Sequence, residues 1–384
     1  MTESIAERYI GLGLRLGRHV DGLVDAYYGP PALAAEVAAE PPLDPGAIAQ
    51  EADDLLGELD DGWLSDQVLG IRTCAAFMAG EPGSYADEVE GCYGIRPAHT
   101  DEAVFAAAHE ELERLLPGGE PLAERYERSR QSTIVPAGRI EAVVAAVIDE
   151  ARAWTAELVG LPDGERVDLE IVRDRPWLAF CEYAGGLCSD ISVNADLPVA
   201  AFQVLHLACH ETYPGHHTER ACKDELLVRG EGLLEETIVL VPTPQSLVSE
   251  GIAELGAEVL LESDGGERLT RALSRAGIEL DLADALAVSR ALDPCRTVEV
   301  NAALMLHEEG VSDEETQAYV ERWNLFTPER AAHIIRFIRE PTSRTYVMNY
   351  SAGHDLCRSY VSGDPARFRR LLTEQVRVRD LRPG

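Results

Sequence analysis

The sequence predicts a mainly α-helical fold with one small β-sheet inserted near the middle of the chain. Apolar side chains recur at intervals of three and four residues over most of the 384 residues, which is typical of amphipathic helices. Clusters of Gly and Pro separate these segments, as they commonly do between helices. Only one segment, residues 166–194, alternates apolar and polar side chains as a strand does. We expect a single large domain over residues 1–384, long enough to bury a sizeable core.

Residues 1–160 are predicted to form the helical N-terminal part of this domain. In residues 3–19, the apolar side chains fall near one stripe of a helix: Ile5, Tyr9, Ile10, Leu12 and Leu16. The same pattern predicts helices at 46–59, 61–80, 99–116, 120–131 and 136–159. Gly29-Pro30-Pro31, Pro41-Pro42 and Pro117-Gly118-Gly119 mark turns between segments.

Residues 161–384 are predicted to carry the sheet and the chemistry. The strand-like alternation appears at both ends of 166–194, at Leu169, Ile171, Ile191 and Val193. Gly185-Gly186 marks a turn between the two ends, so we expect an antiparallel sheet of two or three strands. Helices are then predicted at 244–263, 267–276, 280–308, 312–324, 327–339, 351–361 and 365–376, with prolines that separate or kink them.

Charge and composition exclude several classes of function. The formal net charge is −34, and such an acidic surface repels phosphate backbones, so nucleic acid is not an expected partner. The longest apolar runs, such as 142–148, are too short to span a bilayer, and the N-terminus has no signal-peptide pattern. We therefore expect a cytoplasmic protein with no membrane partner. None of the eight cysteines forms a Cys-x-x-Cys pair, and we expect reduced thiols in the core.

The segment with the strongest chemical signal is residues 205–219, LHLACHETYPGHHTE, which holds four of the ten histidines. It contains His-Glu, the start of the zinc-protease motif His-Glu-x-x-His. In that motif two histidines at i and i+4 share a helical face, and the glutamate between them acts as general base. Here Pro214 stands where the second histidine is expected, and histidines follow only at 216 and 217.

Pro214 and Gly215 explain how a later histidine can take the place of the missing one. On an unbroken helix, the residue at i+6 points about 240° away, and the residue at i+7 lies about 10.5 Å further along the axis. Proline interrupts the helical hydrogen bonds and glycine permits the dihedral angles of a bulge. A two-residue bulge would return i+6 to the position of i+4. We therefore predict His210 and His216 as metal ligands, with Glu211 as general base.

Two alternatives to this ligand pair stay open. His217 could replace His216, because at i+7 it lies on the correct helical face. His206 and His210 form a true i, i+4 pair, which could bind a metal without any bulge. That arrangement would leave Glu211 outside the ligand pair and give Pro214-Gly215 no role, so we prefer to treat His206 as a packed histidine or one that supports a ligand.

A third ligand is expected from residues 249–258, SEGIAELGAE, where three glutamates share one helical face: Glu250, Glu254 and Glu258. Like charges at this spacing repel each other, and the intervening residues are small and apolar. Carboxylates in such surroundings require a cation. We predict Glu250 as the ligand, with Glu254 or Glu258 orienting a histidine. The alternative is a solvated acidic stripe.

With both segments considered, the chain resembles a known family. HETYPGHH followed by SEGIAELGAE resembles the motif pair His-Glu-x-x-Pro-Gly-His-His and Glu-Gly-x-Ala-x-x-x-x-Glu, found in the bacterial family called domain of unknown function 885. That family is similar in fold to the carboxypeptidase Taq group of zinc metallopeptidases, which are mainly helical enzymes with a deep groove. Weaker similarity covers NAALMLHEEGVSDEETQAYV at 301–320 and YVMNYSAGHDLCRSYV at 346–361, so the resemblance spans roughly residues 190–361.

The resemblance implies a zinc ion held by His210, His216 and Glu250, with Glu211 as general base. It also implies a tyrosine or histidine that donates a hydrogen bond to the oxyanion of the tetrahedral intermediate. Tyr350 and His307 are the candidates, and Tyr346 and His354 are weaker ones. In such peptidases an extended substrate adds to an edge strand beside the metal, and SDISVNA at 189–195 is the expected edge.

We therefore expect a zinc-dependent hydrolase, similar to a metallocarboxypeptidase, that acts on a peptide or a small amide. A carboxypeptidase would also need a cation for the substrate's terminal carboxylate, and Arg290, Arg296 and Arg344 are candidates by position. Manganese or cobalt could replace zinc, because two histidines and a glutamate suit several divalent ions. Two other hypotheses are a metal-dependent enzyme of small-metabolite processing and a metal-binding protein without catalysis. The cleaved bond and the oligomeric state do not follow from the sequence.

Overall fold

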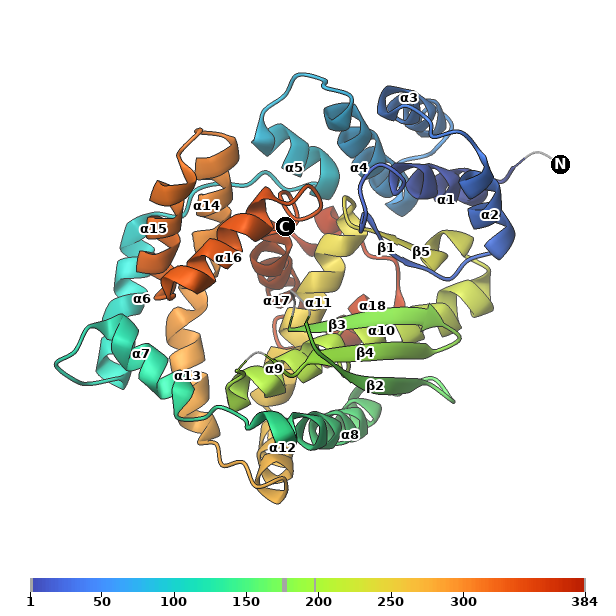
Figure 1. The fold of residues 1–384 in the computed structure, drawn as a ribbon. Coiled ribbons are helices and arrows are strands. Elements are labelled where there is room, and N and C mark those ends of the chain that lie inside the picture. Colours follow the sequence, from blue (N-terminus) through green and yellow to red (C-terminus); the bar gives the residue numbers. More distant parts are fainter. Residues whose placement is uncertain (1–2, 175–177, 197, 383–384) are drawn as a thin grey trace.

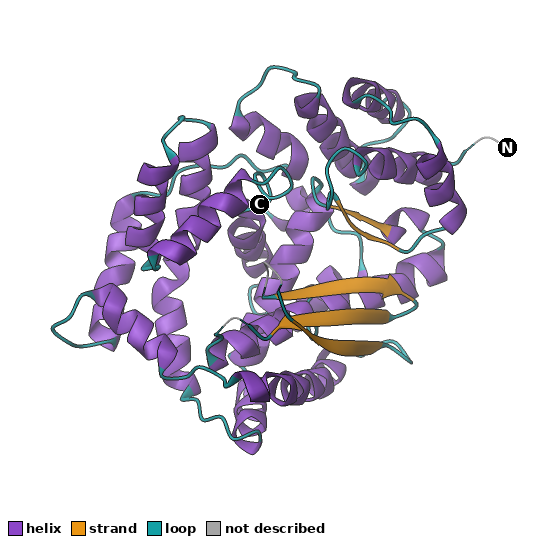
Figure 2. Cartoon of the chain, in the orientation of Figure 1, coloured by secondary structure: helices purple, strands orange, loops and turns teal. Residues whose placement is uncertain are grey.

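Helices make up most of the computed structural model, as the sequence predicts, and the strands form only two small sheets (Figures 1 and 2). The structure describes residues 3–174, 178–196 and 198–382. The helices before the larger sheet are α1 Ile5–Leu16, α2 Pro31–Ala39, α3 Pro45–Leu56, α4 Trp63–Met78, α5 Tyr85–Tyr93, α6 Glu102–Leu115, α7 Leu122–Gln131 and α8 Ile140–Val159. Those after it are α9 Ala201–Glu211, α10 His216–Lys223, α11 Pro244–Leu261, α12 Asp264–Arg275, α13 Leu282–Leu292, α14 Val298–His307, α15 Asp313–Asn324, α16 Pro328–Arg339, α17 His354–Val361 and α18 Pro365–Thr373.

Helix α11 lies at the centre of the fold, and the other helices are arranged around it (Figure 1). Nearly all of its residues are buried, because small and apolar side chains cover most of its surface apart from one face of glutamates. It packs against α9 and α10 on one side and against α17 and the π-helical turn Asn349–Gly353 on another. Any charged group on α11 is therefore enclosed by the helices that carry the histidines.

Close packing of α11 depends on a glycine at its midpoint. A Cβ atom at Gly251 would lie 2.2 Å from the carbonyl oxygen of Gly353, so the two backbones approach more closely than any other residue allows. This contact holds the π-helical turn against the helix that carries Glu250. Replacing Gly251 would push the two segments apart.

The larger sheet contains β2 Arg166–Val172, β3 Ala179–Gly185 and β4 Cys188–Asn194, in the order β2-β4-β3. The predicted turn at Gly185-Gly186 joins β3 to β4, and both glycines have positive φ. Two details of the prediction are wrong. β2 pairs with β4 in parallel, and β4, which contains the expected edge segment, is the central strand. The order leaves β2 and β3 at the two edges of this sheet.

A second sheet was not expected from the sequence. It pairs β1 Val24–Tyr27 with β5 Ile238–Leu240 in antiparallel orientation. These strands are very short and more than 200 residues apart in the chain, so neither gives a periodic signal by itself. The pairing brings the N-terminal segment next to β3, close to the centre of the molecule (Figure 1).

Most predicted helices are present, with ends that differ by a few residues. The predicted helix 280–308 is divided into α13, a 3₁₀ turn at Asp293–Thr297 and α14, because Pro294 interrupts the helical hydrogen bonds. Helices α2 and α5 were not predicted, since both are short and lie beside Pro- or Gly-rich segments. None of the helices in the described ranges combines the length and the apolar character that crossing a membrane requires.

Replacement of Gly251 by Ala is expected to lower the free energy of unfolding by about 1–3 kcal/mol, because the added methyl group overlaps the backbone at Gly353. Chemical denaturation monitored by circular dichroism measures this. The matched control is Gly138→Ala, at a position where an added Cβ has no neighbour within 4 Å. Equal stability of the two variants would show that α11 tolerates displacement from the turn.

Candidate metal centre

A wide turn between α9 and α10 carries the two histidines toward each other. α9 ends at Glu211 and α10 begins at His216. Between them the amide of Gly215 donates to the carbonyl of Cys209, and the amide of Thr218 donates to that of Thr212, so these bonds span six residues instead of four. The turn thus contains the two extra residues that the sequence predicts. A Cβ at Gly215 would lie 1.8 Å from the carbonyl oxygen of His210, so only glycine fits here.

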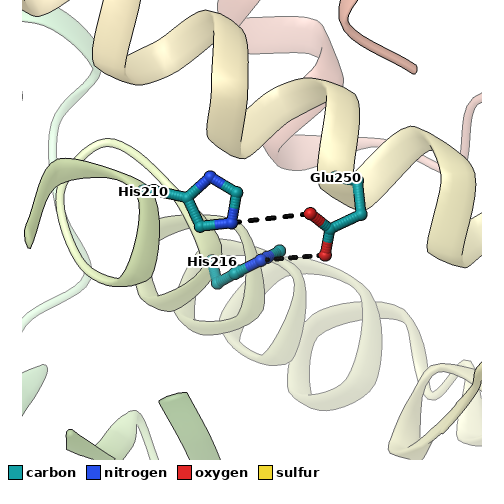
Figure 3. Close-up of side chains that lie close together, drawn as sticks. All are labelled: His210, His216 and Glu250. Carbon is teal, nitrogen blue, oxygen red and sulfur yellow. Dashed lines mark ion pairs between the residues drawn. The ribbon is translucent and has the colours of Figure 1, made fainter. Parts of the chain in front are cut away.

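The structure brings His210, His216 and Glu250 together, with one ligand atom from each inside a group whose members lie within 4.8 Å of one another (Figure 3). Nε2 of His210 lies 3.5 Å from Oε2 of Glu250, and Nε2 of His216 lies 3.2 Å from Oε1. Ligand atoms at about 2.1 Å from a tetrahedral ion are roughly 3.4 Å apart, so these separations suit one ion. Oε2 of Glu250 is also buried and has no hydrogen-bond donor among the described residues. A divalent cation would satisfy it.

The hydroxyl group of Ser249 fixes which nitrogen of His216 is available to a metal. Its single proton is donated to Oε2 of Glu219, at 2.5 Å, so the same oxygen must accept from Nδ1–H of His216, at 3.2 Å. Nε2 of His216 is then unprotonated and points at Glu250. Glu219 is buried and is neutralised by Lys223, with Nζ 2.7 Å from Oε1. These contacts hold the ring of His216 in place and leave its Nε2 able to bind a metal ion.

Glu254 orients the other histidine from one turn further along α11. Its Oε1 lies 3.2 Å from Nδ1 of His210, on the opposite side of the ring from Glu250. Its Oε2 lies 2.9 Å from Nη1 of Arg296 and 3.4 Å from Nε2 of His206. Nδ1 of His210 has no hydrogen-bond partner among the described residues, so Glu254 acts on the ring through its charge, while Nε2 of His210 faces Glu250. His206 therefore contacts a supporting carboxylate and lies outside the ligand group.

His217 follows His216 directly, about 100° further around α10, and is fully buried. Its Nε2 is 2.8 Å from Oε2 of Glu165, and its Nδ1 is 2.8 Å from the hydroxyl of Ser189 on β4. Glu165 also accepts hydrogen bonds from Tyr213, at 2.5 Å, and from Nε of Arg152, at 2.7 Å. This network attaches the wide turn to the sheet and to α8. His217 thus holds the ligand helix in position and does not face Glu250.

Electrostatics favour a cation between the histidines and Glu250. Burial by itself lowers the pKa of His210 and His216, yet the adjacent carboxylates raise both above the ordinary value. Burial raises the pKa of Glu250, but the two histidines outweigh it and hold the pKa well below its ordinary range. Without a metal the site therefore attracts protons, and a divalent ion would compete with them for the same positions.

Glu211 lines the same cavity as the three ligand candidates. Burial raises its pKa above the usual value, and the nearby charges of Glu250 and Asp25 act in the same direction, while His210 and His216 oppose it. No hydrogen bond from a described residue engages its carboxylate. A carboxylate with a raised pKa that faces a cavity is suited to accept a proton.

Two tyrosines from the segment before α17 reach the cavity. The hydroxyl of Tyr346 donates to Oε1 of Glu250 at 2.5 Å, and the ring of Tyr350 packs edge-on against Tyr346 with centroids 5.5 Å apart. Both line the cavity, and burial raises the pKa of both well above the ordinary value, so they stay protonated donors. Tyr350 has no hydrogen-bond partner among the described residues. Its hydroxyl is thus available to a ligand.

The structure does not bring the two candidate histidines of this region to the cavity. Nε2 of His307 donates to the carbonyl of Ile338 at 2.9 Å, and its ring stacks on Tyr85. Nε2 of His354 lies 2.7 Å from Oε2 of Glu258, and neither residue lines the cavity. The expectation that His307 stabilises an oxyanion is therefore not supported by its position. Its donor is already used within the core, which a sequence pattern cannot reveal.

The cavity has a volume of about 290 Å³ and is lined by segments from both halves of the chain. Asp25 and Ala26 come from β1, Val239 comes from β5, and Ala179, Phe180 and Cys181 come from β3. The α9–α11 helices supply the histidines and carboxylates. The strand beside the candidate metal centre is thus β3, the edge strand, and not the segment 189–195 that the sequence suggested.

None of the three arginines proposed from the sequence lines this cavity, and each has a carboxylate partner within the described residues. Arg290 pairs with Glu262, Arg296 pairs with Glu254 and Asp293, and Arg344 pairs with Glu88. The arginine that does line the cavity is Arg220, which sequence reasoning did not select. The signal that could have found it is its spacing, because it follows His216 by four residues on the same helix.

Comparison with known proteins supports the fold and leaves the activity open. No protein-family model matches the sequence, and no curated protein matches it. A solved structure described as "the putative lipoprotein from Colwellia psychrerythraea" has a similar fold, with a TM-score of 0.55 at 14% sequence identity. The match covers 87% of this chain and 65% of that chain, so this chain spans about two thirds of the other protein's length. At this identity the likeness concerns the fold alone.

Replacement of Glu165 by Gln is expected to lower the free energy of unfolding at neutral pH by about 2 kcal/mol, because it removes the charge from a buried hydrogen-bond network. Burial raises the pKa of Glu165, but the bonds from His217 and Tyr213 outweigh it and lower the pKa below the ordinary value. This stabilisation is therefore present above the ordinary carboxyl pKa and is lost as the pH falls through the lowered one.

Urea unfolding at several pH values measures the difference between the wild type and Glu165→Gln. The difference should be largest near neutral pH and should narrow in acid. Glu157→Gln serves as a control, because Glu157 lies on the exposed surface of α8, where it pairs with Arg268, and its replacement should change stability little. A Glu165→Gln effect that grows in acid would contradict the network.

Proposed function

We propose that the protein is a zinc-dependent hydrolase of peptide or amide bonds, similar to a metallocarboxypeptidase. The observation that carries the proposal is the convergence of His210, His216 and Glu250 in a cavity that Glu211 also lines. We also propose membership of the family that the two motifs resemble, domain of unknown function 885. Zinc is the expected ion, although the same ligands suit manganese and cobalt. The cytoplasmic location stays a prediction.

A divalent ion held by the three side chains would polarise a substrate carbonyl and make a water molecule more acidic. Glu211 follows His210 directly and would accept the proton of the attacking water. The water oxygen bonds to the carbonyl carbon, the amide C–N bond breaks, and Glu211 returns the proton to the leaving nitrogen. Atoms balance without any redox partner, and the raised pKa of Glu211 suits both proton transfers.

The tyrosines supply hydrogen-bond donors on the side of the cavity formed by residues 346–350. Tyr350 has a free hydroxyl and is the proposed donor to the carbonyl oxygen as negative charge develops there, a role in which one donor contributes a few kcal/mol. Tyr346 donates to Glu250 and is the proposed positioning residue for this ligand. The sequence resemblance had ranked Tyr346 below Tyr350, and its contact with Glu250 now gives it a distinct role.

The edge strand β3 supports a peptide or peptide-like substrate over an unrelated metabolite. An extended chain can add to the edge of a sheet by main-chain hydrogen bonds, which would align its amide bonds along the cavity wall. A non-catalytic metal-binding protein would have no use for Glu211, which binds no described residue and lines the cavity. Nucleic acid stays an unexpected partner because the net charge is −34. A membrane stays an unexpected partner because the apolar runs are too short to span a bilayer.

Replacement of Glu211 by Gln is expected to keep the metal and the fold but to lower kcat about 100- to 10,000-fold, because the amide cannot accept the proton of water. Zinc content by atomic absorption and turnover of N-blocked peptides are measured on the same preparation. Wild-type rates in the variant would remove Glu211 from the mechanism.

Replacement of His216 by Ala is expected to reduce zinc from roughly one ion per chain to a small fraction, since one of three ligands is lost. His206→Ala is the matched control, because His206 contacts Glu254 and not the ligand group, and it should retain the metal. Full zinc content in His216→Ala together with loss in His206→Ala would transfer the ligand role to His206. Absence of zinc from the wild type would defeat the proposed function.

A further inference from the structure

A second cavity, with a volume of about 610 Å³, differs in its lining from the cavity of the candidate metal centre. Its lining comes from the end of α6 and from α7, α9, α13 and α16. No described residue lines both cavities. The volume falls within the range for small-molecule sites, roughly 300–1,000 Å³. The proposed hydrolysis assigns no role to this second cavity, so its occupant is a separate question.

Two arginines and a tyrosine of this lining lie close together. Tyr126 and Arg130 come from α7, and Arg330 comes from the first turn of α16. The charges of the two arginines act on each other and on the Tyr126 hydroxyl, which places all three groups in one neighbourhood. Two guanidinium groups repel each other, so the arrangement is unfavourable unless an anion lies between them.

Arg330 has no ion-pair partner and no side-chain hydrogen bond among the described residues. Its Nη1 atom is enclosed by the protein, and the ring of Phe326 stacks on the guanidinium with its centroid 4.0 Å from Cζ. Burial and the charge of Arg130 lower the pKa of Arg330, as expected for an uncompensated cation. Acidic residues outnumber basic ones by 68 to 34, so a shortage of carboxylates does not explain the missing partner. An external anion would supply it.

Two glutamates act on these arginines without cancelling their charge. Oε2 of Glu127 lies 3.0 Å from Nη1 of Arg130, so this carboxylate neutralises one of the two guanidinium groups. Glu299 attracts Arg330, but burial raises the pKa of Glu299 to about 7. Near neutral pH the Glu299 carboxyl group is therefore only partly ionised. A positive charge remains around Arg330.

The other acidic residues of the lining are paired or lie away from this charge. Asp281 and Asp284 are at the start of α13, whereas Tyr126 packs against the apolar cluster around Ala291, at the end of that helix. Asp281 and Ala291 are about 15 Å apart along the axis at 1.5 Å per residue. Asp293 forms ion pairs within the protein. The part of the cavity around Arg330 thus suits an anion.

We propose that this cavity binds a phosphate monoester with an apolar body, through Tyr126, Arg130 and Arg330. Two guanidinium groups and a hydroxyl match the two negative charges and three terminal oxygens of such a phosphate, whereas a carboxylate has one charge and two oxygens. Tyr126 has no hydrogen-bond partner among the described residues, so its hydroxyl is free to donate. Apolar side chains of the lining, Leu116 and Phe202 among them, would contact the rest of the ligand. The site goes beyond the proposed hydrolase function and does not depend on it.

Isothermal titration with phenyl phosphate tests the site, because this probe joins a phosphate group to a small apolar ring. The wild type should bind it about 10-fold or more tightly than phenol, benzoate or inorganic phosphate, since charge-assisted hydrogen bonds and apolar contacts both contribute. Absence of binding would overturn the proposal. Phenol or benzoate bound as tightly as phenyl phosphate would overturn the choice of a phosphate, and inorganic phosphate bound as tightly would overturn the apolar body.

Replacements in the two cavities show where the probe binds. Arg330→Gln should weaken binding of phenyl phosphate about 10- to 100-fold, and Tyr126→Phe, which removes only a hydroxyl, should weaken it by a smaller factor. Arg220→Gln is the matched control, because it removes an arginine from the cavity of the candidate metal centre. This control and the removal of metal by a chelator should leave binding unchanged. Binding that is lost with Arg220 or with the metal, but kept in Arg330→Gln, would overturn the proposal.

Thermal unfolding separates ligand binding from a structural role of Arg330. Without ligand, Arg330→Gln should unfold at the same temperature as the wild type or a higher one, because an unpaired cation beside Arg130 is removed. Phenyl phosphate should raise the unfolding temperature of the wild type and leave that of the variant unchanged. A less stable variant that still binds the probe would overturn the proposal. If the variant is less stable and also fails to bind, Tyr126→Phe decides, since weakened binding supports the site and unchanged binding overturns it.

Discussion

The enclosure of three carboxylates, one buried and two partly buried, along one face of α11 is the constraint on which the site depends. Glu250, Glu254 and Glu258 follow each other at one-turn intervals on a helix that other helices enclose. Buried charges are costly unless they are paired, so each carboxylate requires a cationic or hydrogen-bonding partner from a neighbouring element. Two histidines and Tyr346 meet Glu250, while Glu254 meets two histidines and Arg296. His354 and Arg358 meet Glu258.

These partners come from α9, α10, the 3₁₀ turn before α14, the segment that carries Tyr346, and α17, so the charges fix the way in which five segments pack on α11. The hydrophobic effect supplies most of the stability of this packing but has no direction. The carboxylates provide the register, because a shift of one turn would leave a buried charge without its partner. Glu250 has a buried oxygen, Oε2, that no described donor satisfies. The candidate metal centre is therefore a position in this series that the described protein groups do not complete.

Sequence reasoning could predict the parts of this arrangement that are local. The mainly helical fold, the segment of the sheet and the ligand group His210, His216 and Glu250 all follow from spacing within short segments. The wide turn followed from Pro214-Gly215, because proline and glycine have only a few backbone options. Even the choice between His216 and His217 could be argued, since a bulge of two residues changes the helical phase by a known amount.

The parts that could not be predicted depend on contacts between distant segments. β1 pairs with β5 across more than 200 residues, and no periodicity in four residues signals it. His307 had the residue type of a donor, but its nitrogen bonds to Ile338, which depends on how α14 meets α16. Arg220 was overlooked although its spacing from His216 is visible in the sequence. Only the position of Arg220 in the cavity lining distinguishes it from the chain's many surface arginines.

The position of β1 also bears on how the two halves of the chain work together. Residues 1–160 supply no candidate ligand, and by motif alone they would count as a scaffold. Yet Asp25 reaches the cavity because β1 lies beside β3 and pairs with β5, just ahead of α11. A carboxylate there, 4.0 Å from Arg220, lowers the positive potential around the guanidinium without closing a hydrogen bond. Asp25 thus links the N-terminal segment to the electrostatics of the cavity through its charge alone.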